Sequence, residues 1–373
     1  MKCFFLNVGV VLTALTLMLM SCQQKKQTAF RYSMAEFPIS SVKSDLFEKT
    51  SLFLSKGKPA LAILRGRDII KLKVIGDSIY EKIKLPLNIL KINYFKMFSD
   101  SELVVFSDSA IHLFENSKWN TILFEEFGKN ILPLHRNGIL FLPGKRTLIF
   151  TYIKHGEGIN YGKFPFKTNF LIAYDLESKK TRKINLKYPE IYWDGSLGVT
   201  KIHLSSNSSK VIISFSLDPK VYILDINTEK VESIELNGFQ IPLEKTPKID
   251  KTSKKDRLDF LRFIENRFNQ YGFAFQTKNG DLFRLLMPSK PEKNDDGYYF
   301  TKYEKGQEII VKKLNQEKTH NLLLPSGFFY VSKDWNFNAN NNTFYYRKLH
   351  TLKTKTDEFQ TNIVSIKPFS YSF

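Results

Sequence analysis

Short apolar runs repeated along the chain are the feature that most constrains its fold. Each run holds about four to eight residues rich in Ile, Val, Phe, Tyr and Leu, and is bounded by Asn, Asp, Ser, Gly or Lys. The clearest set lies at residues 201–204, 211–216, 221–226 and 231–236. Four consecutive antiparallel strands within about 40 residues are typical of one blade of a β-propeller. The pattern therefore predicts an all-β chain.

Five further segments show the same rhythm less regularly. They are residues 51–85, 94–126, 131–186, 272–324 and 328–369. Internal similarity at such a spacing is the mark of a repeat array, so we predict a single β-propeller domain of about six blades over residues 29–373. Seven blades or a large β-sandwich are the alternatives. In closed propellers the first strand often completes the last blade, and residues 29–32 are expected to pair with the C-terminal blade.

Two of the units contain similar strand ends. Residues 170–180 read FLIAYDLESKK and residues 221–230 read VYILDINTEK. Each gives an apolar strand, an Asp, one apolar residue and a polar turn that closes in Lys. We expect the same strand and turn at both places.

Residues 248–270 break the strand rhythm. The segment is charged, and its apolar residues Leu258, Leu261, Ile264 and Phe268 recur at spacings of three and four. This spacing is typical of an amphipathic helix. We predict a helical or charged surface insert between blades.

The N-terminus resembles a bacterial lipoprotein signal. One positive charge precedes an apolar run of about seventeen residues, which is short for a membrane span. The run ends in Leu-Met-Ser-Cys, and this pattern predicts cleavage before Cys22 and lipid attachment to its thiol. Residues 1–21 are then the signal peptide and residues 22–28 a polar tether. An ordinary secretory signal and an uncleaved anchor are the alternatives.

The remaining composition argues against several kinds of chemistry. Cys3 leaves with the signal and Cys22 carries the lipid, so the mature domain has no thiol for a disulfide, a nucleophile or a zinc site. The sequence contains no HExxH, G-x-S-x-G, phosphate-loop or dinucleotide motif. The six histidines lie far apart and are expected on strands or loops. We predict no catalytic residue, metal or cofactor.

A net charge of +19 comes mostly from lysine, with 45 Lys against 11 Arg. The lysines alternate singly with apolar residues, which is typical of the solvated faces of outer strands. No concentrated patch predicts a nucleic-acid partner. A basic surface could still attract anionic lipid headgroups or polyanionic glycans.

Two loops and two arginines are candidate binding sites. The loops at residues 154–163 and 188–195 combine aromatic rings with acids, and such loops at a propeller mouth could hold a sugar or a peptide. Their candidate side chains are His155, Glu157, Tyr161, Trp193 and Asp194. The alternative for Trp193 is packing between blades.

Arg284 and Arg347 each follow an aromatic residue at comparable positions of the last two units. If their strands line the channel, the guanidinium groups could bind a carboxylate or a phosphate. If the strands are outer ones, both arginines are solvated.

Three motifs complete the pattern: YGFAF at residues 271–275, DLFRL at 281–285 and NTFYYR at 342–347. With the N-terminal cysteine motif and the strand quartets, the chain resembles a Bacteroidetes lipoprotein family with a domain of unknown function, distantly similar to TolB-like six-bladed propellers. The resemblance implies a fold and a location, but no catalytic residue. In those bacteria, acidic residues after the lipidated cysteine mark surface lipoproteins. Residues 23–27 contain none, which implies an outer-membrane protein facing the periplasm, with the cell surface as the alternative.

Together these features predict a membrane-anchored lipoprotein whose propeller is a binding or scaffold domain. Its expected partners are the membrane, through the lipid on Cys22, and a protein or glycan. A propeller hydrolase or lyase acting on glycan or peptide is one alternative, and a sensory accessory protein that binds a small anion is another.

Overall fold

We describe the protein from a computed structural model. The structure describes residues 28–44, 49–73, 78–89, 91–128, 131–133, 138–154, 167–193, 202–207, 210–236, 270–287, 292–293, 299–300, 308–312, 319–323, 329–338, 343–351 and 359–372.

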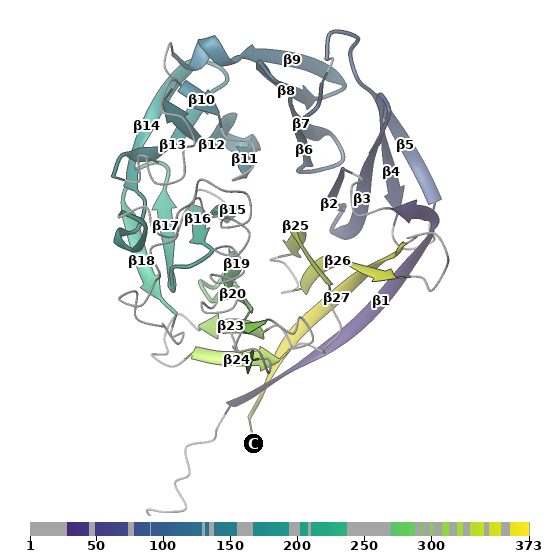
Figure 1. Cartoon of the computed structure of the whole chain (residues 1–373), viewed down its shortest axis with the longest axis vertical. Coiled ribbons are helices and arrows are strands. Elements are labelled where there is room, and N and C mark those ends of the chain that lie inside the picture. The colour runs from purple at the N-terminus through teal and green to yellow at the C-terminus, as the bar shows by residue number, and fades with distance from the viewer. Residues whose placement is uncertain are drawn as a thin grey trace, which may run out of the picture.

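The described strands form six sheets of four or five strands that stand around a ring (Figure 1). Blade 1 contains β2 (Thr50–Ser55), β3 (Lys58–Arg65), β4 (Asp68–Lys73) and β5 (Ser78–Lys84). Blade 2 contains β6 (Tyr94–Met97), β7 (Glu102–Phe106), β8 (Ala110–Glu115) and β9 (Lys118–Leu123). Blade 3 contains β10 (Ile131–Pro133), β11 (Ile139–Leu142), β12 (Thr147–Lys154), β13 (Asn169–Asp175) and β14 (Lys180–Lys187).

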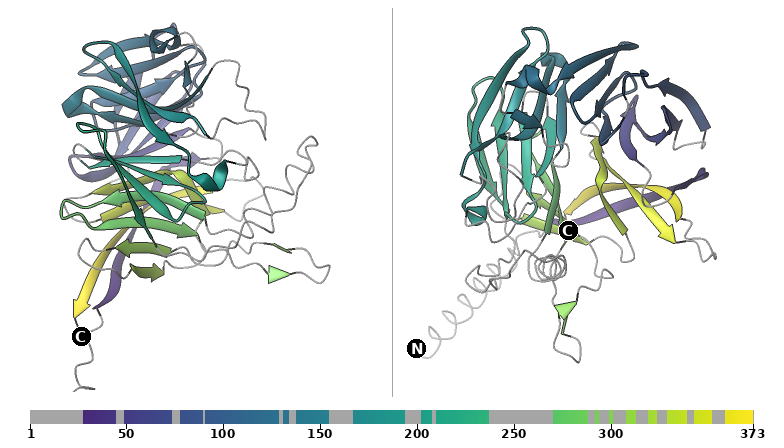
Figure 2. Two further views of the ribbon diagram at one scale, coloured as in Figure 1. Left: turned by 90° about the vertical axis from the view of Figure 1, so that its left-hand side faces the viewer. Right: turned by 45° about the horizontal axis from the view of Figure 1, so that its top comes forward.

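Blade 4 contains β15 (Ile202–Asn207), β16 (Lys210–Phe215), β17 (Lys220–Asp225) and β18 (Val231–Glu235). Blade 5 contains β19 (Gln270–Gln276), β20 (Leu282–Met287), β23 (Glu308–Lys312) and β24 (Thr319–Leu323). The short strands β21 (Glu292–Lys293) and β22 (Tyr299–Phe300) pair with each other and stand away from the ring (Figure 2). Short 3-10 segments η1 (Phe124–Phe127), η3 (Pro143–Lys145) and η4 (Glu190–Tyr192) connect strands.

Blade 6 is assembled from both ends of the chain. It contains β25 (Phe329–Asn338), β26 (Thr343–Thr351) and β27 (Phe359–Ser372), and β1 (Thr28–Ser44) is its outermost strand. The antiparallel register of β1 and β27 runs from Thr28 opposite Ser372 to Ser44 opposite Phe359, with one irregularity between Ile39 and Lys43. The expected pairing of residues 29–32 with the C-terminal blade is therefore confirmed.

Strands inside the ring are buried on both faces because each blade packs between two others. In β7, Val104 and Phe106 belong to an apolar cluster shared with blade 3, whereas Leu103 and Val105 belong to one shared with blade 1. A strand covered on both faces has a continuous apolar run. A continuous apolar run in the sequence therefore indicates a strand that lies between two blades.

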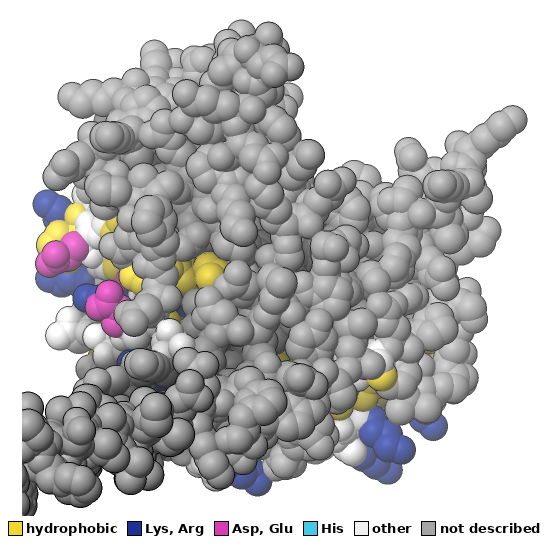
Figure 3. Space-filling model, turned by 90° about the horizontal axis from the view of Figure 1, so that it is seen from below, with side chains coloured by type: hydrophobic (Ala, Val, Ile, Leu, Met, Phe, Trp, Pro, Cys, Tyr) yellow, Lys and Arg dark blue, Asp and Glu magenta, His cyan; other side chains and the backbone are white. Residues whose placement is uncertain are grey.

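Outer strands have the opposite pattern. In β14 only Ile184 and Leu186 are buried, and the Lys and Arg side chains are exposed. Charged residues on an edge strand discourage pairing with another chain. Figure 3 shows the described basic side chains in several separate places on one face. The lysines of β14 thus lie on a solvated outer strand, as predicted.

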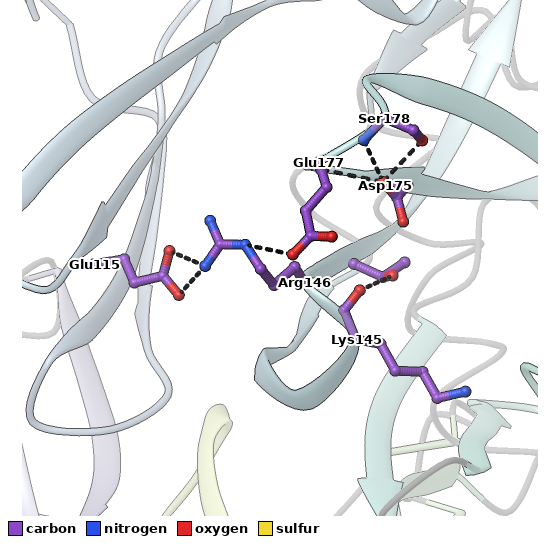
Figure 4. A network of polar contacts seen from close by, with 7 residues as sticks. Glu115, Lys145, Arg146, Asp175, Glu177 and Ser178 are labelled. Atoms are coloured by element: carbon purple, nitrogen blue, oxygen red, sulfur yellow. Dashed lines mark hydrogen bonds and ion pairs between the residues drawn. The ribbon is translucent and has the colours of Figure 1, made fainter.

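The two similar strand ends form the same turn. In the first, the Asp175 carboxylate accepts hydrogen bonds from the backbone N–H groups of Glu177 and Ser178 (Figure 4). In the second, Asp225 accepts from Asn227 and Thr228. Both turns then place a residue in the left-handed region, Lys179 with φ 54° and Glu229 with φ 56°. The structural repeat predicted at these positions is confirmed.

The ring is a β-propeller arrangement, as predicted, and the six predicted units each coincide with one sheet within a few residues. These sheets belong to the described residues, and the total number of blades stays a prediction. Residues 1–27, with the signal, Cys22 and the tether, and residues 248–269 lie outside the described part. Among the described helices, none has the length and apolar character needed to span a membrane.

Candidate functional site

The innermost strands of the blades surround the axis of the ring. They are β2, β6, β11, β15, β19 and β25 (Figure 1). Between blades 1 and 2, the N–H of Met97 donates to Ser51 Oγ at 3.0 Å. Between blades 6 and 1, Asn336 Nδ2 donates to the Leu52 carbonyl at 3.4 Å. Polar contacts thus link the inner strand of blade 1 to the inner strands of both neighbouring blades.

Blades 4, 5 and 6 meet at the axis through aromatic rings. The His203 ring on β15 lies 4.5 Å from the Phe273 ring on β19, measured between centroids. Phe273 stacks with Phe275 at 6.0 Å, and Phe275 lies 5.3 Å from Phe337 on β25. These contacts place His203 in an aromatic interface between blades, on a strand as the sequence predicted.

Lys96 is a cation on the inner strands between blades 2 and 3. It lies on β6, and its Nζ donates to the carbonyl of Ile139 on β11 at 3.3 Å. The same Nζ lies 5.3 Å from the centre of the Phe98 ring. The side chain is half-buried, and desolvation lowers the pKa of its ammonium to about 8. Burial in apolar surroundings disfavours the charged form of lysine, which explains the direction of the shift.

Sequence inspection missed Lys96, although its neighbours contain a signal. It lies in the run Tyr94-Phe95-Lys96-Met97-Phe98, where both strand faces are otherwise apolar. In an outer strand one face would be polar. A single lysine within a run that is apolar on both strand faces therefore indicates a lysine side chain that lies between two blades.

Arg284 lies on β20, the second strand of blade 5, and only 1% of it is exposed. Its Nε donates to Ser214 Oγ at 3.0 Å, and its Nη2 donates to the Phe215 carbonyl at 2.7 Å. Its Nη1 donates to the Lys220 carbonyl at 3.3 Å. The alternative of a solvated outer-strand arginine is therefore wrong for Arg284, because its guanidinium faces blade 4.

Burial also acts on the charge of Arg284. Desolvation lowers the pKa of its guanidinium to about 10, opposed by the nearby Tyr271 and Asp218. The group is therefore still a cation at neutral pH. Its acceptors from blade 4 are oxygens of the protein itself, so it connects two blades. Arg347 lies on β26, and its side chain is outside the described part.

The loop that carries Trp193 is described as far as that residue. The indole Nε1 donates to the Tyr188 carbonyl at 2.7 Å, and Lys167 Nζ lies 5.9 Å from the centre of the indole ring. Trp193 packs against the cluster shared by blades 3 and 4, which agrees with the packing alternative for this residue. His155, Glu157, Tyr161 and Asp194 lie outside the described residues.

Two other cations, Lys71 and Arg146, have carboxylate partners. Lys71 on β4 is fully buried and donates to Glu81 at 2.8 Å and to the Asp100 carbonyl. Arg146 Nη1 lies 2.7 Å from a carboxylate oxygen of Glu115 and its Nε 3.5 Å from Glu177 (Figure 4). In the described part of the chain, no group of three or more His, Cys, Asp or Glu could hold a metal ion.

No family model and no curated protein matches the chain. Several solved structures are similar to it. A putative exported protein of Bacteroides fragilis has a TM-score of 0.53 at 11% identity, over 90% of this chain and 95% of that one. The calcium-binding protein regucalcin of Agrobacterium tumefaciens has a TM-score of 0.43 at 11% identity, over 90% and 95%. The β-propeller domain of Cps50 (Swd1) from Myceliophteria thermophila has a TM-score of 0.42 at 9% identity, over 87% and 83%.

The chain is a β-propeller. At these identities the likeness concerns the fold alone, and it covers nearly the whole propeller. The Bacteroides fragilis structure agrees with the fold that the family resemblance implies. Function therefore has to be argued from the residues of this propeller.

Proposed function

We propose that the protein is a lipid-anchored component of the bacterial cell envelope whose propeller is a binding or scaffold domain. The position of β1 carries this proposal. β1 begins at Thr28, six residues after Cys22, and it is the strand that closes the ring. A lipid on Cys22 would hold the propeller by its closing strand.

The pairing of β1 supports such an attachment mechanically. Thr28 lies opposite Ser372, so β1 begins beside the C-terminal end of β27 (Figure 1). Pulling on the N-terminus would load many hydrogen bonds of the β1–β27 ladder along the strand direction. A long antiparallel ladder therefore suits an anchored end.

Two further observations support a location outside the cytoplasm. The similar solved structure from Bacteroides fragilis is described as a putative exported protein. The polar tether at residues 23–27 contains no acid, which favours the periplasmic side of the outer membrane by the family resemblance. We propose this location for the mature protein, with a protein or a glycan as partner.

The anchor is tested by Cys22→Ala, with Cys3→Ala as the matched control because Cys3 lies within the signal. In cells fed labelled palmitate, the wild-type protein and the control are expected to incorporate label and to sediment with membranes. The Cys22→Ala variant is expected to lose the label and to leave the membrane fraction. Unchanged labelling and sedimentation of that variant would contradict lipid anchoring.

The binding role is tested by crosslinking in intact cells that express the wild-type protein at its natural level. Recovery of one protein or glycan with the wild type, and its loss with Cys22→Ala, would support a partner held at the membrane. Protease added to intact cells tests the side of the membrane. Digestion of the propeller would place it on the cell surface.

A further inference from the structure

The strand alternation of β6 places Lys96 on an apolar face. Phe95 and Met97 belong to the cluster shared with blade 1. Tyr94 and Phe98 pack against the cluster shared by blades 2 and 3. Because side chains alternate along a strand, Lys96 lies on the same face as Tyr94 and Phe98, toward blade 3. An apolar residue would fit the pattern better there than an ammonium group does.

The partners of Lys96 among the described residues use little of its hydrogen-bonding capacity. An ammonium has three donors, and one of them meets the Ile139 carbonyl at 3.3 Å. The Phe98 ring offers a cation–π contact at 5.3 Å. Desolvation is the one cause of its lowered pKa, and no charge of a described residue contributes to the shift. The ammonium therefore lacks a carboxylate among the described residues.

Two cations that are more deeply buried than Lys96 differ in this respect. Lys71 has Glu81 at 2.8 Å, and Arg284 has three oxygen acceptors from blade 4. For each of these two cations the protein thus supplies a carboxylate or several oxygen acceptors. At Lys96 it supplies one carbonyl, on the innermost strand of the neighbouring blade.

We propose that Lys96 binds a small oxyanion, a carboxylate or a phosphate group, at the inner strands of blades 2 and 3. The proposal deepens the binding role proposed above and rests on it. A bound oxyanion would provide the missing counter-charge and accept the remaining N–H donors. Because Lys96 is half-buried, such a charge-assisted hydrogen bond is less weakened by water than one at the open surface.

The surroundings also indicate which anions fit. Phe98 lies 6.0 Å from Phe141 of blade 3, and Tyr94 lies 6.2 Å from Phe106, both with edge-to-face geometry. Aromatic walls beside a cation suit a carboxylate or phosphate attached to an apolar body. We therefore use benzoate and phenyl phosphate as probes, with inorganic phosphate to test whether the oxyanion alone suffices.

The experiment is calorimetric titration of the full-length, detergent-solubilised protein with each probe at constant ionic strength in chloride buffer. We expect the wild-type protein to bind at least one probe and Lys96→Met to bind it about tenfold more weakly or not at all. Lys96→Arg keeps the positive charge and is expected to retain binding. Lys91→Met is the matched control, because Lys91 is an exposed lysine in the same blade, paired with Asp108.

Three outcomes decide the proposal. Loss of binding in Lys96→Met with retention in Lys91→Met supports it, and the probe that binds tells a carboxylate from a phosphate. Equal binding by the wild type and Lys96→Met overturns it, and so does the absence of binding by the wild type. Should Lys96→Met not fold, Lys96→Gln gives the same comparison. None of these measurements depends on the lipid, so failure of the anchor proposal is detected separately by palmitate labelling.

Discussion

The guanidinium carbon of Arg284 lies 4.0 Å from the centre of the Tyr271 ring, and both residues belong to blade 5. Tyr271 thus covers one face of the guanidinium while the nitrogens donate to blade 4. A planar guanidinium can lie flat on a ring and donate several hydrogen bonds in its own plane, whereas a lysine ammonium has no flat face to stack. The pair therefore orients Arg284 for its contacts across the blade boundary.

Replacing Arg284 by Lys is expected to lower the free energy of unfolding by about 2–4 kcal/mol. The lysine would keep a buried charge but lose most of the hydrogen bonds to blade 4 and the stacking on Tyr271. Denaturant unfolding measures the change. Arg182→Lys is the control, because Arg182 makes an exposed ion pair with Glu229 and should change stability by less than about 1 kcal/mol. Equal effects of the two substitutions would contradict a structural role for Arg284.

Asp100 connects blade 2 to three strands of blade 1. Its carboxylate accepts from the Tyr80 hydroxyl and the Ser55 hydroxyl, each at 2.6 Å, and its carbonyl accepts from Lys71. Desolvation and the Asp100 carboxylate raise the pKa of Tyr80, so this phenol is a donor throughout the physiological range. The contact network lies at the turn between β6 and β7.

Tyr80→Phe removes one donor of this network and is expected to lower the free energy of unfolding by about 1 kcal/mol. Asp100→Ala leaves two hydroxyl groups without their acceptor and should lower it by about 2–3 kcal/mol. The double variant should lose less than the sum, because both substitutions remove the same bond. Urea unfolding of the four proteins provides the test. Strict additivity would show that the Tyr80–Asp100 bond contributes nothing.

Lys179 occupies the left-handed position of the first repeated turn. A residue with a Cβ is strained there, so Lys179→Gly is expected to raise the free energy of unfolding by about 0.5–1 kcal/mol. The neighbouring Lys180 begins the regular strand β14 and provides the control. Lys180→Gly should lower stability, because glycine in a strand loses backbone entropy. Thermal unfolding distinguishes the two, and stabilisation by neither or by both would contradict the turn geometry.

Much of the fold could be predicted from sequence for a physical reason. A strand between two blades is buried on both faces, as in the run from Leu103 to Phe106. Such a strand needs apolar residues at every position, so it can be recognised in the sequence as a continuous apolar run. The repeated turns at Asp175 and Asp225 were also readable, because the carboxylate that organises each turn occupies the same place in both units. Local signals sufficed in these cases.

The candidate sites depended on contacts between blades, which local patterns do not contain. Arg284 could be assigned to a strand from the sequence. Whether its side chain faces blade 4, where its acceptors lie, depends on packing between residues about 70 positions apart. Lys96 could not be singled out among the 45 lysines from the sequence. Its position between two blades becomes apparent only when the packing of its neighbours on both strand faces is known.

Lys96 makes a pH-dependent contribution to stability whose sign follows from its pKa. Its pKa is about 8 in the folded protein and about 10.4 in an unfolded chain. Between these values the unfolded state binds more protons than the folded state, so this group makes the free energy of unfolding rise as the pH increases from about 8 to 10.4. Well below pH 8 the half-buried charge is present in full, and its unfavourable effect on the folded state is greatest.

Lys96→Met removes this charge and keeps a side chain of similar length in an apolar setting. In chloride buffer without a bound oxyanion, we expect the variant to exceed the wild type in stability by on the order of 2 kcal/mol at pH 7. The advantage should shrink as the pH approaches 10, where the wild-type lysine is neutral in the folded state. Denaturant unfolding at pH 7, 8, 9 and 10, with Lys91→Met as control, measures the difference. A Lys96→Met variant less stable than wild type at pH 7, or a difference that does not vary with pH, would show that the ammonium has a counter-charge in the folded protein.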